Sequence, residues 1–210
     1  CIRRLPDTYG FDPMKDIQVL SPTKKGPAGV VNLNPELQKV LNPADRKKTE
    51  KPSGNNIFRE GDRIMQVRNN YELRWEKTDN SSEDGTGVFN GDVGLILKIN
   101  DEAQCIEVLF DDERLVQYDY SILDEIEPAY AVTIHKSQGS EFPVVVMPIF
   151  PGPGVLMTRN LLYTAVTRAV NMVVLVGEEN SLIKMVENER EAFRYSGLSD
   201  KLKKYMVYAD

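Results

Sequence analysis

Residues 133–142 read TIHKSQGSEF, a polar segment that directly follows one apolar run and precedes another. The flanking runs, YAVTI at 130–134 and VVVMP at 144–148, are short and rich in β-branched side chains, as buried strands are. Helical spacing and a further apolar run alternate downstream: NLLYTAVTRA at 160–169, MVVLV at 172–176 and an amphipathic stretch at 181–195. This alternation predicts an α/β fold with a parallel sheet covered by helices on both faces.

The first third of the chain predicts one strand, one loop and one helix. Residues 17–20 (IQVL) are a strand candidate, and SPTKKGPAG at 21–29 follows as a loop rich in Pro and Gly. PELQKVL at 35–41 places apolar side chains at helical spacing, with Asn34 as the expected N-cap. The polar stretch at 42–56 predicts a mobile connector.

The middle third predicts short β-strands. RIMQVR at 63–68 is a strand candidate, and GVFNGDVGLILKI at 87–99 carries an Asn-Gly pair at 90–91, which is typical of hairpin turns. The runs CIEVLF at 105–110 and LVQY at 115–118 predict a second hairpin. Four or five strands in so short a stretch predict a small barrel, which limits exposed strand edges.

The distribution of charge also separates the middle third of the chain from the first and last thirds. The net charge of −6 combines +4 over 1–58, −11 over 59–128 and +1 over 129–210. A break of this size favours an inserted module at 59–128, between two parts of one domain at 1–58 and 129–210. The alternative is a solvated acidic face of a single domain.

Several classes of protein are excluded. Cys1 and Cys105 are too few for a disulfide framework, which favours a reducing, cytoplasmic location, and no apolar run reaches the roughly 20 residues that cross a membrane. His135 is the only histidine, so no metal cluster is expected, and neither G-x-x-x-x-G-K-[ST] nor a strand-to-helix G-x-G-x-x-G occurs. Because the chain opens with a cysteine, we expect it to be cut from a longer protein.

Two segments carry side chains suited to phosphate or ribose. TIHKSQGSEF offers hydroxyl, imidazole, ammonium, amide and carboxylate groups after a strand, where α/β sheets bind ligands. The alternative is a polar loop that caps the next element. In LYTAVTRA at 162–169, Arg168 either pairs with a carboxylate or awaits an anion.

The order of these segments resembles superfamily 1 helicases. TIHKSQGSEF and LLYTAVTRA resemble motifs V and VI, while LSPTKKGPAGVVNLNPELQKVLNP, GDRIMQVRNNY and VFNGDVG resemble the RecD-like branch, which includes the exodeoxyribonuclease V alpha subunit. The resemblance implies the second RecA-like motor domain of the P-loop NTPase type, interrupted by a small SH3-like β-barrel. It extends from about Ile17 to Gly177.

The family also implies roles for individual residues. Arg168 would be the catalytic arginine finger that reaches the γ-phosphate of ATP. The remaining ATP-binding residues would be Lys24, Lys25, Gln138, Gly139 and Glu141, and the phosphate loop and Mg²⁺ ligands would lie in an upstream domain. The DNA-binding residues would be Thr133, His135, Lys136 and Ser137, together with Arg68, Asn70 and Tyr71 in the barrel. Packing of Tyr71 and Trp75, within the barrel or between domains, is the alternative that we favour for those two rings.

The sequence therefore predicts the C-terminal half of an ATP-dependent 5′→3′ DNA helicase that acts in DNA repair or recombination, and we expect this chain alone to be inactive. Its expected partners are single-stranded DNA, the upstream motor domain and subunits of a repair complex, with no membrane. Two alternatives stay open: a non-enzymatic module that binds single-stranded DNA or a partner through the barrel, and a self-contained nucleotide hydrolase.

Overall fold

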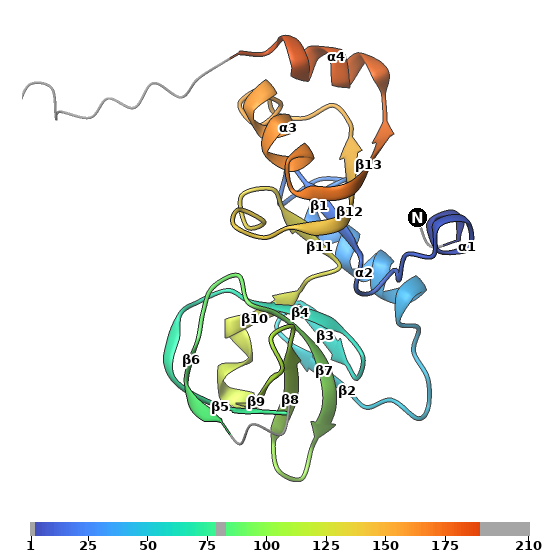
Figure 1. Ribbon diagram of the computed structural model, residues 1–210. Helices are drawn as coiled ribbons and strands as arrows, with labels where there is room; N and C mark the ends of the chain where they lie inside the picture. Colours follow the sequence, from blue (N-terminus) through green and yellow to red (C-terminus); the bar gives the residue numbers. More distant parts are fainter. Residues whose placement is uncertain (1–2, 79–82, 190–210) are drawn as a thin grey trace, which may run out of the picture.

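The computed structural model describes residues 3–78 and 83–189 of the 210-residue chain. These residues form a four-stranded parallel sheet, a seven-stranded antiparallel sheet and a two-stranded hairpin. Figure 1 shows the parallel sheet and its helices above the strongly curved antiparallel sheet, with the chain crossing between the two more than once.

The parallel sheet has the order β11-β1-β12-β13. Its strands are β1 (Ile17–Ser21), β11 (Ala131–Thr133), β12 (Phe142–Ile149) and β13 (Ala169–Gly177). All three strand pairs run parallel, which confirms the predicted α/β arrangement. Since β1 lies between two strands that are more than 100 residues later, the sheet can form only when the two ends of the described chain come together.

Helices lie on both sides of this sheet. The helices α3 (Arg159–Val166) and α4 (Glu179–Glu187) contribute to the core that contains the β12 side chains Val145 and Met147. The next side chains along β12 point to the opposite face, where they pack with Leu5 of α1 (Arg4–Tyr9). The alternation of strand side chains thus divides the apolar residues between two cores.

The helix α2 (Val30–Leu41) begins five residues earlier than expected, and the predicted N-cap is wrong. Gly29 is the N-cap, and Asn34 lies inside the helix with only 9% of its surface exposed. The Asn34 amide donates to the carbonyl oxygens of Pro128 and Ala131, both at 3.0 Å, and its oxygen accepts from the Ala131 backbone N–H at 2.7 Å. Asn34 therefore attaches α2 to the entrance of β11.

Two further predictions need correction. The stretch 42–56 is not a simple connector, because it contains β2 (Glu50–Ser53) and the start of β3 (Asn56–Arg59), which pair as a hairpin. An ion pair of 2.6 Å between Arg59 Nε and Glu50 Oε1 joins the two strands. The helix expected at 181–195 ends at Glu187, and positions 190–195 lie outside the described residues.

The seven-stranded sheet has the order β10-β4-β7-β8-β9-β5-β6 and is antiparallel throughout. Its strands are β4 (Arg63–Gln66), β5 (Asn70–Lys77), β6 (Asp84–Val88), β7 (Val93–Asn100), β8 (Cys105–Phe110), β9 (Arg114–Asp119) and β10 (Ile126–Pro128), with the 3-10 helix η1 (Tyr120–Glu125) before β10. The predicted hairpin between β8 and β9 is confirmed. The sheet curves around its own core, which includes Phe58, Ile106 and Tyr118.

The predicted hairpin around the Asn90-Gly91 pair is wrong. The strands on either side of it do not pair with each other, because β6 pairs with β5 while β7 pairs with β4 and β8. Gly91 does adopt a positive φ of 104°, and its N–H donates to the carbonyl oxygen of Gln66 at 2.9 Å. The turn is thus bonded to the end of β4 and carries the chain across the sheet.

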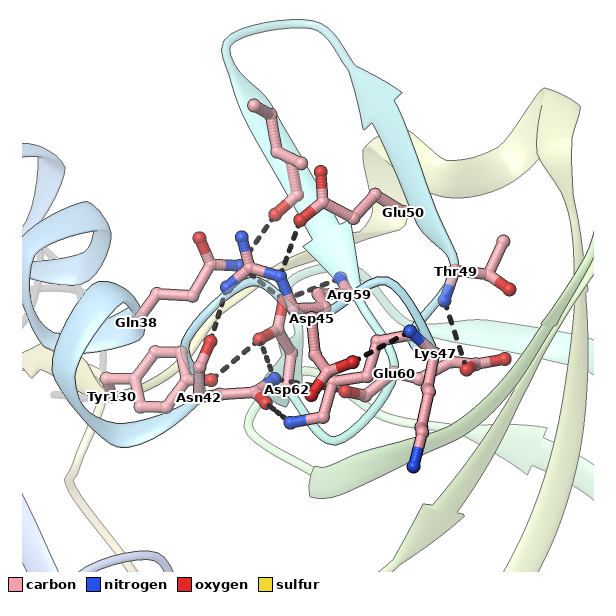
Figure 2. Close-up of polar contacts among 12 residues, drawn as sticks. Gln38, Asn42, Asp45, Lys47, Thr49, Glu50, Arg59, Glu60, Asp62 and Tyr130 are labelled. Carbon is pink, nitrogen blue, oxygen red and sulfur yellow. Dashed lines mark hydrogen bonds and ion pairs between the residues drawn. The ribbon is translucent and has the colours of Figure 1, made fainter.

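A buried carboxylate joins the two sheets (Figure 2). Asp62, which is 0% exposed, accepts four hydrogen bonds. The donors come from α2, β3 and the entrance to β11: Gln38 Nε2 at 2.6 Å and the Asn42 amide, the Arg59 backbone N–H and the Tyr130 hydroxyl at 2.7 Å each. Burial, and then the Asp62 charge, raise the pKa of Tyr130, so its hydroxyl stays protonated and donates. Asp62 therefore fixes the curved sheet against the parallel one.

Replacing this carboxylate should destabilise the fold. Asp62→Asn keeps the shape of the side chain but removes one negative charge and turns an acceptor into a donor that faces other donors. We expect the free energy of unfolding to fall by about 2–4 kcal/mol, measured by urea denaturation. Asp84→Asn, on the exposed start of β6, is the matched control and should change stability by less than about 0.5 kcal/mol. Equal urea midpoints for the two variants would contradict this account of the junction.

Candidate functional site

The segment 134–141 leaves the parallel sheet at the carboxyl end of β11. Thr133 is the last residue of β11 and lies opposite Ser21, the last residue of β1. The Ile134 N–H extends the strand pairing by donating to the carbonyl oxygen of Ser21 at 3.1 Å. The predicted site residues thus begin at the edge where parallel sheets bind ligands.

Local hydrogen bonds fold this segment into a compact turn. The Lys136 N–H donates to the Thr133 carbonyl oxygen at 2.9 Å, and the Ser140 N–H donates to the Ser137 carbonyl oxygen at 3.1 Å. Ser137 is fully buried, and its hydroxyl donates to the carbonyl oxygen of Ile134 at 2.8 Å. The Ser137 hydroxyl is therefore part of the turn and is not presented to a ligand, contrary to the predicted DNA contact.

The outer part of the turn is open to solvent. His135, Gln138, Gly139 and Glu141 are all exposed. Within the described part of the chain, the side chains of His135, Gln138 and Glu141 make no hydrogen bond or ion pair. These groups can therefore meet a ligand without losing a contact inside the protein.

Arg168 lies beside the end of this turn. Its Nη1 donates to the carbonyl oxygen of Ser140 at 3.2 Å, and its own carbonyl oxygen accepts from the Phe142 N–H at 2.8 Å. Its Nε is buried without a hydrogen-bond partner, and no carboxylate among residues 3–78 and 83–189 pairs with it. A half-buried guanidinium with unused donors is suited to an anion, because an unpaired donor costs free energy until it is bonded.

Lys24 and Lys136 meet on one carboxylate. Lys136 Nζ lies 2.9 Å from Glu127 Oε2, and Lys24 Nζ lies 3.6 Å from Glu127 Oε1. Burial alone would raise the pKa of Glu127, but the hydrogen bonds and charges of Lys136 and Lys24 outweigh it and hold the pKa below its ordinary value. The structure thus brings Lys24 to the start of the turn. Its neighbour Lys25 is also exposed, and its side chain has no hydrogen bond or ion pair with the described residues.

Two of the barrel residues predicted to bind DNA already have acidic partners. Arg68 Nη1 pairs with Asp124 Oδ2 at 2.6 Å. The Asn70 amide donates to Glu125 Oε2 at 2.9 Å. The acidic residues that precede β10 therefore already hold both polar groups.

The two aromatic rings for which we considered packing, those of Tyr71 and Trp75, differ in burial. Trp75 is half-buried against the core of the curved sheet, which confirms the packing alternative for this ring. Tyr71 is 67% exposed and meets Phe89, itself 42% exposed, edge-on at 5.7 Å, so Tyr71 is not packed into the barrel core, and its packing between domains stays a prediction. This difference leaves an exposed aromatic pair beside Asn69, whose amide donates to the Tyr71 hydroxyl oxygen at 3.4 Å.

Sequence reasoning missed Glu127, Asp62 and Tyr130. Each acts through partners that lie far along the chain, such as Lys24 for Glu127 and Gln38 for Asp62. A lone acidic residue in a strongly acidic segment gives no signal of such a partner. For Tyr130, the only hint is its position just before the strand that leads into the turn.

The groups at the end of the turn are donors and acceptors that suit an anion on one side only. Arg168 and the exposed turn can form one wall around a phosphate chain, but the sequence contains no phosphate loop for the other wall. Among the described residues, no three His, Cys, Asp or Glu side chains come close enough to hold a metal ion. None of the described helices is both long enough and apolar enough to span a bilayer.

Comparison with known proteins identifies two family matches along the chain. Residues 33–110 match the family described as the ATP-dependent RecD-like DNA helicase SH3 domain. Residues 128–176 match the family described as the UvrD-like helicase C-terminal domain. The first match covers most of the curved sheet, and the second covers the turn and Arg168.

Two relatives show similarity over most of this chain. The ATP-dependent RecD2 DNA helicase of Deinococcus radiodurans is 31% identical over 180 residues, which are 84% of this chain and 22% of the relative. The RecBCD enzyme subunit RecD of Mycolicibacterium smegmatis is 31% identical over 186 residues, 89% of this chain and 29% of the relative. The chain thus spans about a quarter of the length of these relatives.

Solved structures show the same fold. The Pif1 helicase from Bacteroides, in complex with ADP-AlF3 and single-stranded DNA, superposes with a TM-score of 0.54 at 19% identity. The match covers 99% of this chain and 49% of the Bacteroides chain.

The turn at 134–141 should depend on glycine at its exposed tip. Gly139 has a φ of +92°, and a methyl group added there would meet no atom of the described chain within 4 Å, so the cost of alanine is backbone strain alone. We expect Gly139→Ala to lower the free energy of unfolding by about 1 kcal/mol in urea denaturation. Gly154→Ala, at an equally open position without a positive φ, should be neutral or slightly stabilising. The interpretation fails if both variants behave alike.

Proposed function

The chain belongs to the RecD-like DNA helicases of superfamily 1, and on this basis we propose that it forms the second motor domain of an ATP-dependent 5′→3′ DNA helicase. In this proposal Arg168 is the arginine finger of ATP hydrolysis. The observation that carries the proposal is the half-buried guanidinium of Arg168, which has no ion-pair partner in the described chain and lies against the turn at 134–141.

ATP with Mg²⁺ would bind between this domain and a domain that supplies the phosphate loop and the Mg²⁺ ligands. Arg168 would donate to the γ-phosphate across the interface and neutralise the charge that grows as the phosphoryl group is transferred, an effect of about 10³-fold or more in comparable enzymes. Gln138, Gly139 and Glu141 lie at the same end of the turn. There, Glu141 would accept a hydrogen bond from a ribose hydroxyl.

The start of the turn would bind the DNA backbone. Thr133, His135 and Lys136 offer a hydroxyl, an imidazole and an ammonium group, which bind phosphates without reading bases. Such contacts suit a motor that moves along any sequence. We add Lys24 to this group because Lys24 and Lys136 both pair with Glu127. The predicted contacts of Lys24 and Lys25 with the phosphates of ATP stay predictions.

The domain limits follow the charge pattern. We assign 1–58 and 129–210 to the motor domain and 59–128 to the inserted SH3-like barrel. By analogy with the RecD subunit of RecBCD, the partners would be single-stranded DNA, the rest of the helicase and, in some settings, subunits of a recombination or repair complex.

The finger role predicts a specific kinetic defect. In the whole helicase, Arg168→Ala should lower the DNA-stimulated rate of ATP hydrolysis by about 10³-fold, because the transition state loses its cation, and should leave the dissociation constant for ATP nearly unchanged. Arg168→Lys should recover only a small part of the rate, since an ammonium lacks the planar fork of a guanidinium. Steady-state kinetics and nucleotide titration provide the two readouts.

Arg46→Ala is the matched control, because Arg46 is exposed and its substitution removes one positive charge, as Arg168→Ala does. Its rate should equal that of the wild type. Normal turnover by the Arg168→Ala helicase would refute the finger role.

A second candidate function is DNA binding by the barrel itself, favoured by the exposed Tyr71–Phe89 pair. In other proteins that bind single strands, a base stacked on an aromatic side chain contributes about 1–3 kcal/mol to binding, and Tyr71 could hold a base in the same way. Tyr71→Ala should therefore weaken binding of oligo-dT by about fivefold or more, measured by fluorescence anisotropy. Tyr9→Ala removes another exposed ring, on α1, and should have no effect. Equal affinities for the two variants would leave the barrel without a stacking role.

A further inference from the structure

We propose that Lys24 and Lys136 form a phosphate-binding site that the carboxylate of Glu127 occupies in this structure. The inference rests on the proposed function and adds a regulatory group to it. Glu127 would act as an internal substitute for phosphate, which a ligand must displace before it can bind.

Three separate parts of the chain build this site. Lys24 lies in the loop that follows β1, Lys136 lies in the turn that follows β11, and Glu127 belongs to β10 at the edge of the curved sheet. Each lysine faces a different oxygen of the carboxylate, at 3.6 Å and 2.9 Å. A barrel residue thus holds two loops of the motor domain at once.

A cavity of about 100 Å³ lies at this point, with Lys24, Glu127, Thr133 and Lys136 among its lining residues. Apolar side chains, including Met65 and Val132, contribute to the rest of its lining. The polar side chains of the lining carry one hydroxyl, one carboxylate, two ammonium groups and the amide of Asn34, which is already bonded to backbone groups. Once Glu127 swings away, the remaining polar groups are those that commonly bind a phosphate.

The charge of the site favours exchange of one anion for another. Two lysines and one carboxylate leave a net charge of +1, so the lysines are only partly neutralised. The side chain of Lys24 is 61% exposed, that of Glu127 is 38% exposed and that of Lys136 is 32% exposed, so solvent weakens both ion pairs. Such pairs contribute little stability, and a ligand with several phosphates can therefore displace the carboxylate.

The carboxylate should lower the affinity for phosphate ligands without abolishing binding. A motor that steps along a strand must release each phosphate, and a built-in competitor speeds that release. Because Glu127 also belongs to the curved sheet, displacing it would loosen the contact between β10 and the turn whenever a phosphate binds.

The test removes the charge of Glu127 in the whole helicase and measures binding of labelled oligo-dT by fluorescence anisotropy over a series of salt concentrations. Glu127→Gln should bind about two- to fivefold more tightly than the wild type, in line with the modest strength of half-exposed pairs. The dependence of log K on log[salt] should steepen by up to about 0.7, the value for one further single-strand phosphate contact.

Two controls isolate the interaction. Glu102→Gln removes the same charge from the exposed β7–β8 turn and should leave affinity unchanged. In a Lys24→Met, Lys136→Met background, Glu127→Gln should have no effect, because no cations remain to be released. The proposal would be overturned if Glu127→Gln raised the affinity in that background as much as it does in the wild type. It would also be overturned if, in the wild-type background, Glu127→Gln raised the affinity for oligo-dT and for Mg-ATP no more than Glu102→Gln does.

A parallel titration with Mg-ATP separates the two sources of phosphate. A change confined to oligo-dT assigns the site to the DNA backbone, and a change confined to ATP assigns it to the nucleotide; both support a phosphate site. The result of these binding measurements does not depend on whether Arg168 is the arginine finger. Loss of turnover in Arg168→Ala with no effect of Glu127→Gln would retain the finger and reject this site, and the reverse result would retain the site and reject the finger.

Discussion

The buried carboxylate of Asp62 is the constraint on which the rest of the structure depends. A charge with no exposed surface must be satisfied by hydrogen bonds, and the four donors around Asp62 come from α2, β3 and the residue before β11. These bonds hold the curved sheet at one position relative to the parallel sheet. Because Tyr130 directly precedes β11, they also fix where the turn at 134–141 begins.

The turn at 134–141 connects two regions with different chemistry. At its start, Thr133 and Lys136 lie beside Lys24 and Glu127, next to the curved sheet. At its end, the carbonyl oxygen of Ser140 accepts from Arg168. Hydrogen bonds within the turn connect its two ends. In the proposed function, this connection would let ATP hydrolysis at one end change the contacts with DNA at the other.

Much of the fold follows from local patterns in the sequence. The apolar β-branched runs identify the parallel strands because such strands are buried on both faces, and the insert is visible in its net charge of −11. Arg168 could be predicted as a candidate because an arginine in an apolar and hydroxylic segment needs an anion. Its lack of a carboxylate partner among residues 3–78 and 83–189, however, could come only from the structure.

Other features escaped prediction because their partners are distant in sequence. Asn34 looked like a helix cap, but its side chain bonds to residues almost 100 positions away. The β2–β3 hairpin contains Pro, Gly and charged residues, and its cross-strand ion pair gives no periodic signal. The ion pairs of Glu127 with Lys24 and Lys136 form only when both sheets are folded, so no local pattern in the sequence could reveal them.

The most direct test of the central claim is the position of the Arg168 guanidinium in a crystal structure of the whole helicase with ADP–aluminium fluoride and oligo-dT. The account predicts that the guanidinium leaves the carbonyl oxygen of Ser140 and lies about 3 Å from the fluoride atoms that stand in for the transferred phosphoryl group. A guanidinium that stays on Ser140, or that pairs with a carboxylate away from the nucleotide, would contradict it.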